Sequence, residues 1–245
     1  METAMNSESV LREKLATCAR IFSMQGLLGL FGHVSAYDPK SGCVFISPGM
    51  GKDKATLKAN DILAIDLTGR PLEGSAEPPV EWPIHTTLHA ARSDALAVAH
   101  LHSPYATLYA IARREFRPVT LQGALFADGV PLYTEAQLVK TVAQGERLVK
   151  LIGHRRAALL RGHGIVAVGR DLEEALFASL ILEDDTRKAM QAAALGELEF
   201  FSEGECRAFA TEDDWRRRAH RAWNYFAQLE ARWDRHPATG AGPLA

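Results

Sequence analysis

The sequence predicts an α/β fold in a single domain, because helical and strand patterns alternate along the chain. Apolar residues recur at helical spacing over residues 7–25, which predicts an amphipathic helix. A continuous apolar run at residues 95–102, broken only by two histidines at alternate positions, is typical of a buried strand. Two short strands around the turn at 162–164 precede a long helix that Asp171 caps.

The length and composition fit one domain with a sizeable core. The chain has 245 residues, of which 47% are hydrophobic, and it contains no internal repeat or low-complexity tract. We expect residues 1–245 to form one domain. The last ten or so residues, from about residue 236, have the composition of a disordered tail.

Charge and cysteine usage exclude several classes of protein. The formal net charge is −2 and the acidic and basic residues are interspersed, which argues against binding to nucleic acid or to a membrane surface. The N-terminus does not resemble a signal peptide, and no apolar run approaches the roughly 18 residues of a membrane span. Cys18, Cys43 and Cys206 are too scattered for a disulfide framework. We therefore expect a cytoplasmic protein with reduced thiols.

The other segments complete the expected order of elements. The acidic residues at 183–185 of the long helix are expected to form a solvated turn, and the aromatic-rich last helix to pack on the core or on a neighbouring subunit. The patterns predict strands at 33–37, 43–46, 60–67 and 118–121, and helices at 81–92, after His102, at 135–152, at 172–195 and at 211–233.

The two histidines of the central strand are candidate metal ligands. Side chains at i and i+2 of a strand share one face, so His100 and His102 can reach one point in space. A lone histidine in an apolar strand is more often a hydrogen-bonded core residue, but two adjacent buried imidazoles need a shared partner. His163, between two glycines, and Glu81 provide a third and a fourth ligand. We therefore predict a divalent metal site.

Two further features of the sequence are open to more than one interpretation. The glycine-containing loops at 29–33 and 47–51 can hold an anion through backbone N–H groups, or can serve only as turns. His85 and His89 share one face of the helix at 81–92. They are either additional site residues or ordinary helix-face histidines, and the second interpretation is favoured for His89.

Five motifs in this order resemble the class II aldolase/adducin family over about residues 11–195. They are GHVS, ISPG, a Glu-Trp pair with a histidine four residues after the Glu, AVAHLH and RGHGIVAVG. The resemblance implies a three-layer α/β/α fold with a mainly antiparallel central sheet. It also implies a homotetramer with sites at subunit interfaces and a divalent metal. His100, His102 and His163 match the family's metal-binding histidines, and Glu81 matches its ligand and acid/base carboxylate.

The departures from the sugar-phosphate aldolases of that family bear on the substrate. Gly32-His33 stands where those enzymes have Gly-Asn, and Pro79-Val80 stands where they have Ser-Ser. A phosphate would lose several charge-assisted hydrogen bonds, each worth roughly 1.5–3 kcal/mol. We therefore expect a non-phosphorylated substrate, with a carboxylate held by His33 and the loop at 47–52. The predicted substrate-binding residues are Gly32, His33, Ser47, Gly49, Lys52 and Gln122, the last in place of the family's tyrosine.

The predicted function is that of a metal-dependent carbon–carbon lyase. Three imidazoles leave open positions on a divalent ion for two oxygens of a small hydroxy-carbonyl or hydroxy-acid substrate. Aldol cleavage and decarboxylation through a metal-stabilised enolate both fit. Zn is favoured, although Mn, Co and Fe suit the same ligands. The alternatives are a sugar epimerase, an Fe(II) oxygenase and a non-catalytic, adducin-like scaffold.

Overall fold

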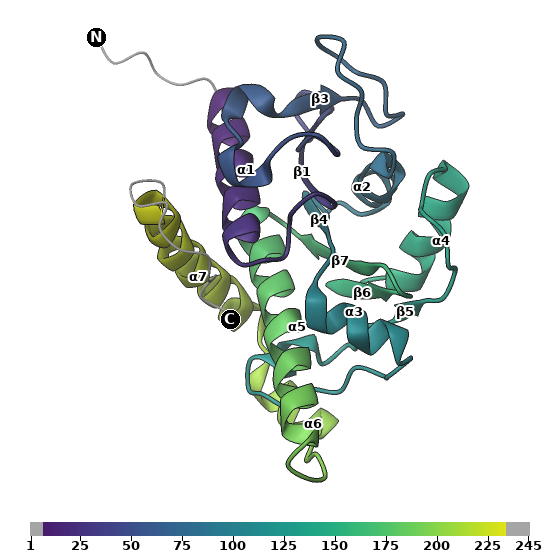
Figure 1. Cartoon of the computed structure of the whole chain (residues 1–245), viewed down its shortest axis with the longest axis vertical. Coiled ribbons are helices and arrows are strands. Elements are labelled where there is room, and N and C mark those ends of the chain that lie inside the picture. The colour runs from purple at the N-terminus through teal and green to yellow at the C-terminus, as the bar shows by residue number, and fades with distance from the viewer. Residues whose placement is uncertain (1–6, 234–245) are drawn as a thin grey trace.

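The computed structural model describes residues 7–233 and contains one seven-stranded sheet with helices on both faces (Figure 1). The strand order is β3-β2-β1-β4-β7-β6-β5, and every neighbouring pair is antiparallel except β5 and β6. The predicted three-layer fold with a mainly antiparallel sheet is thus confirmed. The strands are β1 (His33–Asp38), β2 (Cys43–Ile46), β3 (Leu63–Ile65), β4 (Ala97–Leu101), β5 (Leu132–Tyr133), β6 (Ala157–Leu160) and β7 (Gly164–Gly169).

The helices form two layers around this sheet. Helices α1 and α5 cover one face and α2 and α4 cover the other, while α7 lies on the outside of α1 and α5 (Figure 1). No helix among residues 7–233 is long and apolar enough to cross a membrane. The α-helices are α1 (Ser7–Met24), α2 (Trp82–Ala91), α3 (Pro104–Ile111), α4 (Val142–Ile152), α5 (Leu172–Ala193), α6 (Glu203–Phe209) and α7 (Glu212–Trp233). Three short 3-10 helices are η1 (Lys54–Thr56), η2 (Ala59–Asp61) and η3 (Gly123–Phe126).

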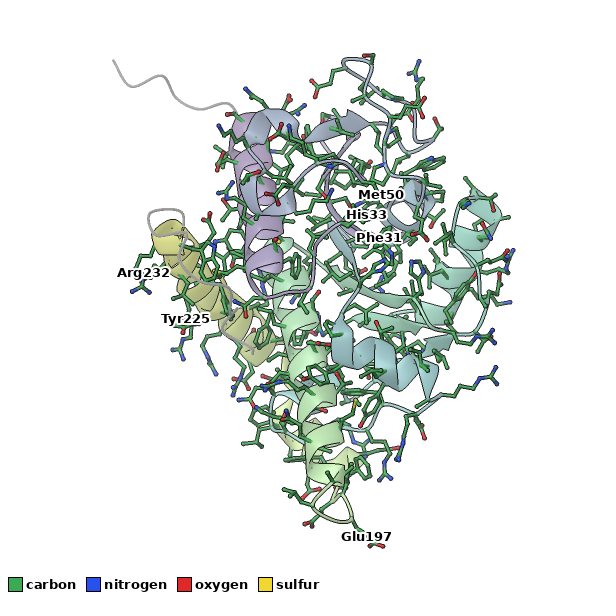
Figure 2. All side chains as sticks on the ribbon, in the orientation of Figure 1. Phe31, His33, Met50, Glu197, Tyr225 and Arg232 are labelled. Carbon is green, nitrogen blue, oxygen red and sulfur yellow. The ribbon has the colours of Figure 1, made fainter. Side chains whose placement is uncertain are left out.

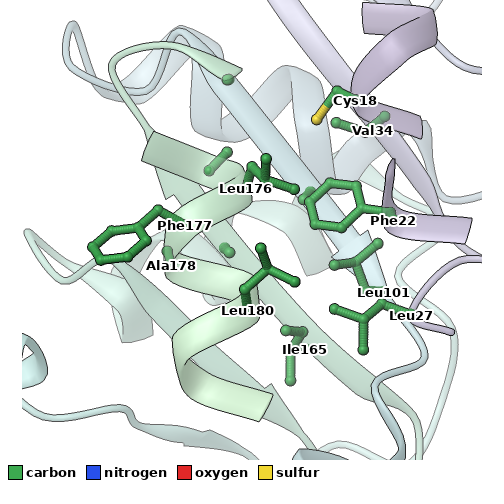
Figure 3. Close-up of a cluster of buried hydrophobic side chains, with 14 of the residues drawn as sticks. Cys18, Phe22, Leu27, Val34, Leu101, Ile165, Leu176, Phe177, Ala178 and Leu180 are labelled. Carbon is green, nitrogen blue, oxygen red and sulfur yellow. The ribbon is translucent and has the colours of Figure 1, made fainter. Parts of the chain in front are cut away.

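The alternation of side chains along β4 decides which layer contains the candidate site. Ala97, Ala99 and Leu101 belong to the larger core under α1 and α5, part of which is drawn in Figure 3. Val98 belongs to the smaller core under α2 and α4. Since successive residues of a strand point to opposite faces, His100 points toward the α2 side of the sheet.

Several expected boundaries differ from the structure, each for a local reason. The strand expected at 60–67 is only three residues long, because Asp61 accepts from the N–H of Lys58 and closes η2 just before it. The helix expected at 135–152 begins at Val142, where Thr141 and Gln144 form a capping box. Helix α6 was not predicted, although Ser202 and Glu205 form the same kind of box at its start.

The acidic residues of α5 correct two further expectations. Glu183 and Asp185 are buried, so the prediction of a solvated turn is wrong. Asp185 accepts hydrogen bonds from the N–H groups of Val119 and Thr120, which makes the segment at 118–121 a turn instead of the expected strand. The tail predicted from about residue 236 lies outside the described residues.

Candidate metal centre and active site

Four chain segments bring the predicted ligands to one end of the sheet. His100 lies on β4, and His102 follows one residue after that strand ends. His163 lies in the turn between β6 and β7, and Glu81 immediately precedes α2. Because β4 pairs with both β1 and β7, His100 lies directly opposite His33 on one side and Val166 on the other.

The three histidines are close enough to share one ion. One ring nitrogen from each of His100, His102 and His163 lies within 4.8 Å of the others. The ring centroid of His163 is 4.7 Å from that of His100 and 4.8 Å from that of His102. A second group of ligand atoms within 4.8 Å of one another comes from His33, Glu81 and His100. The residue types and their convergence fit a divalent ion bound mainly by imidazole.

The hydrogen bonding of His100 prepares one nitrogen for a metal. Its Nδ1 is 3.0 Å from the carbonyl oxygen of Ile165, and a carbonyl can only accept, so Nδ1 carries the proton. The lone pair is therefore on Nε2, which is buried and has no hydrogen-bond partner among residues 7–233. A ligating histidine typically donates its other N–H to such a carbonyl. This buried, unsatisfied nitrogen fits a metal ligand.

Glu81 faces the same point with one carboxylate oxygen. Its Oε1 accepts from the N–H of Val139 at 2.9 Å, and its Oε2 lies 3.4 Å from Nε2 of both His100 and His163. Burial raises the pKa of Glu81, but its contacts with the His100 and His163 rings outweigh burial and hold that pKa well below its usual range. A proton or a metal cation between these atoms satisfies the carboxylate.

His102 closes the cluster on the side of the pocket. Phe31 stacks on its ring with a centroid distance of 5.3 Å and an interplanar angle of 20°. Burial, and then the neighbouring His100 and His163, lower the pKa of His102 to about 4. At neutral pH this imidazole is uncharged, which is the form that binds a metal.

Glycines allow the backbone segments that carry these ligands to approach closely. A Cβ on Gly164 would collide with the carbonyl oxygen of Leu101, between the segments that carry His163 and His102. Gly32 has φ +88°, and a Cβ there would lie 2.9 Å from the carbonyl oxygen of His100. Larger residues at these positions would push the ligand-bearing segments apart.

An open pocket of about 680 Å³ lies over the cluster. Besides Glu77, its ionisable lining residues are members of the two ligand groups, and we call these the pocket floor: His33, Glu81, His102 and His163. Figure 2 marks three of the lining residues, Phe31, His33 and Met50. Its walls are largely apolar and include Leu30, Phe31, Met50, Pro78, Pro79, Val80 and Leu138. A wall of this kind favours an apolar or aromatic ligand body over a phosphate.

The predicted substrate-binding residues divide into two groups. Gly32, His33 and Gly49 line the pocket. The other three, Ser47, Lys52 and Gln122, are outside its lining and stay predictions. The hydroxyl oxygen of buried Ser47 accepts from Val34 N–H, Lys52 pairs with Asp61 at 2.7 Å, and Gln122 is an exposed residue just before η3.

The structure adds Lys54, which was not predicted as a site residue. Its ammonium group is buried and donates to the carbonyl oxygens of Pro48 and Gly49, so it holds the loop on one wall of the pocket. Burial lowers the pKa of Lys54. From sequence, a lysine in a loop of charged residues is expected to be exposed. The burial of Lys54 and its bonds to the loop could therefore not be predicted.

Comparison with known proteins assigns the family. The family model described as "Class II Aldolase and Adducin N-terminal domain" matches residues 13–189. The chain belongs to this family. The resemblance found in the five sequence motifs is thereby confirmed.

Curated relatives of this family member include both decarboxylases and aldolases. The chain is 30% identical over 197 residues to a 3,4-dihydroxyphthalate decarboxylase of Arthrobacter keyseri, covering 76% of this chain and 79% of the relative. It is 28% identical over 198 residues to a 5-deoxy-D-ribulose 1-phosphate aldolase of Bacillus thuringiensis serovar kurstaki, covering 79% and 91%. An aldolase II superfamily protein from Pseudomonas syringae has the same fold, with a TM-score of 0.82, 22% identity, and coverage of 94% and 96%.

Proposed function

We propose that this protein is a metal-dependent decarboxylase of a small, non-phosphorylated hydroxyaromatic acid. The observation that carries the proposal is the convergence of His100, His102, His163 and Glu81 at the floor of a pocket with apolar walls. The decarboxylase relatives support the lyase reaction type. An aromatic ring suits a wall that contains Phe31 and Val80 and offers few hydrogen-bond donors.

The three histidines would hold the metal, and Glu81 would complete the ligand set or exchange with substrate. Zn is favoured, and Mn, Co and Fe suit the same donors. A divalent ion at this position supplies Lewis-acid polarisation of the substrate's oxygen atoms. The lone pair of His100 Nε2 is already oriented for it by the bond from Nδ1 to Ile165.

Glu81 would move the proton in this reaction. Its Oε2 takes the proton of a substrate hydroxyl and returns it to the ring carbon that bears the carboxylate. The bond to the carboxylate carbon then breaks, its electron pair stays with the ring, and carbon dioxide leaves. The bond from Val139 N–H to Oε1 keeps the carboxylate oriented during this transfer.

Aldol cleavage is the second candidate reaction. The named relative in Bacillus thuringiensis is an aldolase, and the same cluster can polarise the carbonyl and hydroxyl groups of an aldol. Because Pro79 and Val80 form the wall, an aldol substrate would also lack a phosphate.

We further propose that the active protein is a cytoplasmic homotetramer whose sites lie at subunit interfaces. The mouth of the pocket exposes apolar side chains, with Phe31 50%, Met50 69% and Val80 58% exposed. Such a patch is typical of a surface that a partner covers. All three cysteines are buried and unpaired, as expected in a reducing compartment. The mass of the particle in solution, measured by light scattering, tests the assembly.

A product screen tests the reaction. Metal-loaded protein is incubated with hydroxyaromatic acids, hydroxy acids and unphosphorylated aldols, and carbon dioxide and aldehyde are both recorded. Carbon dioxide without aldehyde from a hydroxyaromatic acid is the expected result, and it should disappear after chelation. Aldehyde without carbon dioxide would replace the proposal with the aldolase. If neither product formed, both proposals would be wrong, and oxygen-uptake and epimerase assays would follow.

A further inference from the structure

A continuous chain of hydrogen bonds runs from the pocket floor into the layer between the sheet and α2. It begins at Nδ1 of His33, which lies 2.6 Å from Nε2 of His85. Nδ1 of His85 lies 2.6 Å from the hydroxyl of Ser35, which is also 2.8 Å from Nε2 of His89. The chain ends where Nδ1 of His89 meets the carbonyl oxygen of Ala95 at 2.5 Å.

The carbonyl at the far end fixes the direction of every bond in this chain. Because a carbonyl only accepts, His89 must donate to it through Nδ1, and the Nε2 of neutral His89 must accept from Ser35. The single proton of the Ser35 hydroxyl is then used, so that oxygen accepts from Nδ1 of His85. Neutral His85 therefore accepts through Nε2.

The last bond of the chain sets the tautomer of His33. Since Nε2 of His85 accepts, Nδ1 of His33 carries the ring proton and donates it. The remaining nitrogen, Nε2, has a free lone pair and makes no hydrogen bond to any of residues 7–233. His33 lines the pocket and lies directly opposite His100 in the sheet.

The three interior residues of this hydrogen-bond chain are buried, which keeps their tautomers fixed. Ser35 and His85 have no exposed surface and His89 is 4% exposed. Burial lowers the pKa of His89 to about 4, so it stays neutral at physiological pH. No carboxylate hydrogen-bonds to His85 or His89 among the described residues, and each ring therefore has one proton to donate.

We propose that His33 is a hydrogen-bond acceptor for a second hydroxyl group of the substrate, and that Ser35, His85 and His89 are positioning residues that fix its tautomer. The proposal rests on the proposed function for the presence of an aromatic hydroxy acid in the pocket. It narrows the substrate class to rings that carry a hydroxyl donor beside the metal-binding group.

This assignment replaces the role that the sequence predicted for His33. The free lone pair on Nε2 of a neutral imidazole repels a carboxylate, whereas a hydroxyl group donates a hydrogen bond to it. The carboxylate of the substrate must therefore bind elsewhere in the pocket. The backbone at Pro48 and Gly49, which Lys54 holds in place, also lines the pocket.

The tautomers can be measured directly and without any substrate. Nitrogen-15 chemical shifts of the imidazoles in metal-free wild-type protein at pH 7.5 should show Nδ1–H on His33, His85 and His89. Assignment uses His33→Gln, His85→Gln and His89→Gln variants, each of which removes one set of signals. An Nε2–H signal from His33 or His85 would overturn the proposal. This readout does not depend on activity, so a failed decarboxylase assay would leave it intact.

A binding comparison tests whether the hydrogen-bond chain through Ser35 makes His33 an acceptor. Catechol and phenol are titrated into zinc-loaded wild type, Ser35→Ala and Ser179→Ala, with unchanged circular dichroism as the check on folding. Ser179 is an equally buried serine whose one side-chain hydrogen bond within residues 7–233 goes to the carbonyl of Ala175, so it is a matched control. The preference for catechol over phenol should fall at least about tenfold in Ser35→Ala and stay unchanged in Ser179→Ala. An equal preference in all three proteins would overturn the role of His33 as an acceptor.

Discussion

Oε2 of Glu81 lies 3.4 Å from Nε2 of His100, and both atoms have electron pairs to donate once the ring proton of His100 is on Nδ1. Two buried donors of electron pairs do not remain adjacent unless a proton or a metal cation lies between them. The two residues come from different elements, since Glu81 immediately precedes α2 and His100 lies on β4. It is also the structural basis for assigning both ligation and proton transfer to Glu81.

Glu81→Gln should separate the charge of this residue from its shape. The amide oxygen can still accept from Val139 N–H, so the fold should persist, but the side chain can no longer take a proton. We expect kcat to fall by about 10²-fold or more. Glu77→Gln is the matched control, because Glu77 lines the same pocket but does not belong to either group of converging ligand atoms. Equal losses in the two variants would contradict the role of Glu81.

Gly164→Ala should disturb the segments that hold His102 and His163. The new methyl group would collide with the carbonyl oxygen of Leu101, and we expect the free energy of unfolding to fall by about 1–3 kcal/mol. Metal affinity should fall with it. In Gly204→Ala the nearest atom is the Ser202 hydroxyl oxygen at 3.9 Å, so this control in α6 should be neutral or stabilising. Urea denaturation compares the two, and unchanged stability of Gly164→Ala would contradict the close approach.

Glu183 should be important for stability although it lies far along a helix. Its carboxylate accepts from the hydroxyl of Ser103 and from the N–H groups of Tyr105 and Ala106, at the start of α3. Glu183→Ala leaves these donors without an acceptor and should lower the free energy of unfolding by about 2–4 kcal/mol.

The neighbouring Asp184 provides the control for that measurement. It is partly exposed and pairs with Arg187 and Lys188, and Asp184→Ala should cost less than about 1 kcal/mol. Chemical denaturation of both variants under the same conditions tests the difference. Similar losses would show that Glu183 is not the cap of α3.

Acid should destabilise the metal-free protein through His89. The pKa of His89 is about 4 in the folded protein and about 6.5 when unperturbed, so the unfolded chain binds more protons between these values. The free energy of unfolding contributed by neutral His89 is therefore present above pH 6.5 and is lost as the pH falls toward 4. In His89→Gln the dependence between pH 6 and pH 5 should be weaker by at most about 1.4 kcal/mol per pH unit. The exposed His154, substituted in the same way, should leave the dependence unchanged, and an equal slope in His89→Gln would contradict the burial argument.

The main elements and the metal cluster could be predicted because their signals are local. The i, i+2 spacing of His100 and His102 places both side chains on one face of a strand. The strand at 43–46 and the Asp171 cap followed equally from short patterns, and both are confirmed. Glu81 and His163 came from the wider order of motifs, and the fold brings them to the same point.

The remaining features depend on which segments pack together. Helical spacing shows that His85 and His89 share a face, but only the packing of α2 on β1 places Ser35 between them. Glu183 and Asp185 have the composition of a solvated turn, yet they satisfy backbone donors from segments about 65 to 78 residues earlier. Charge alone cannot distinguish a buried cap from an exposed residue.

Metal content tests the central claim that three histidines form one site. Wild type, His102→Ala and the exposed-surface control His154→Ala are dialysed against the same low concentration of free Zn²⁺, and bound metal per chain is measured with circular dichroism as the check on folding. We expect close to one ion in wild type and His154→Ala, and an affinity lower by at least about tenfold in His102→Ala. Full occupancy of His102→Ala at low free metal would contradict the assignment of the site.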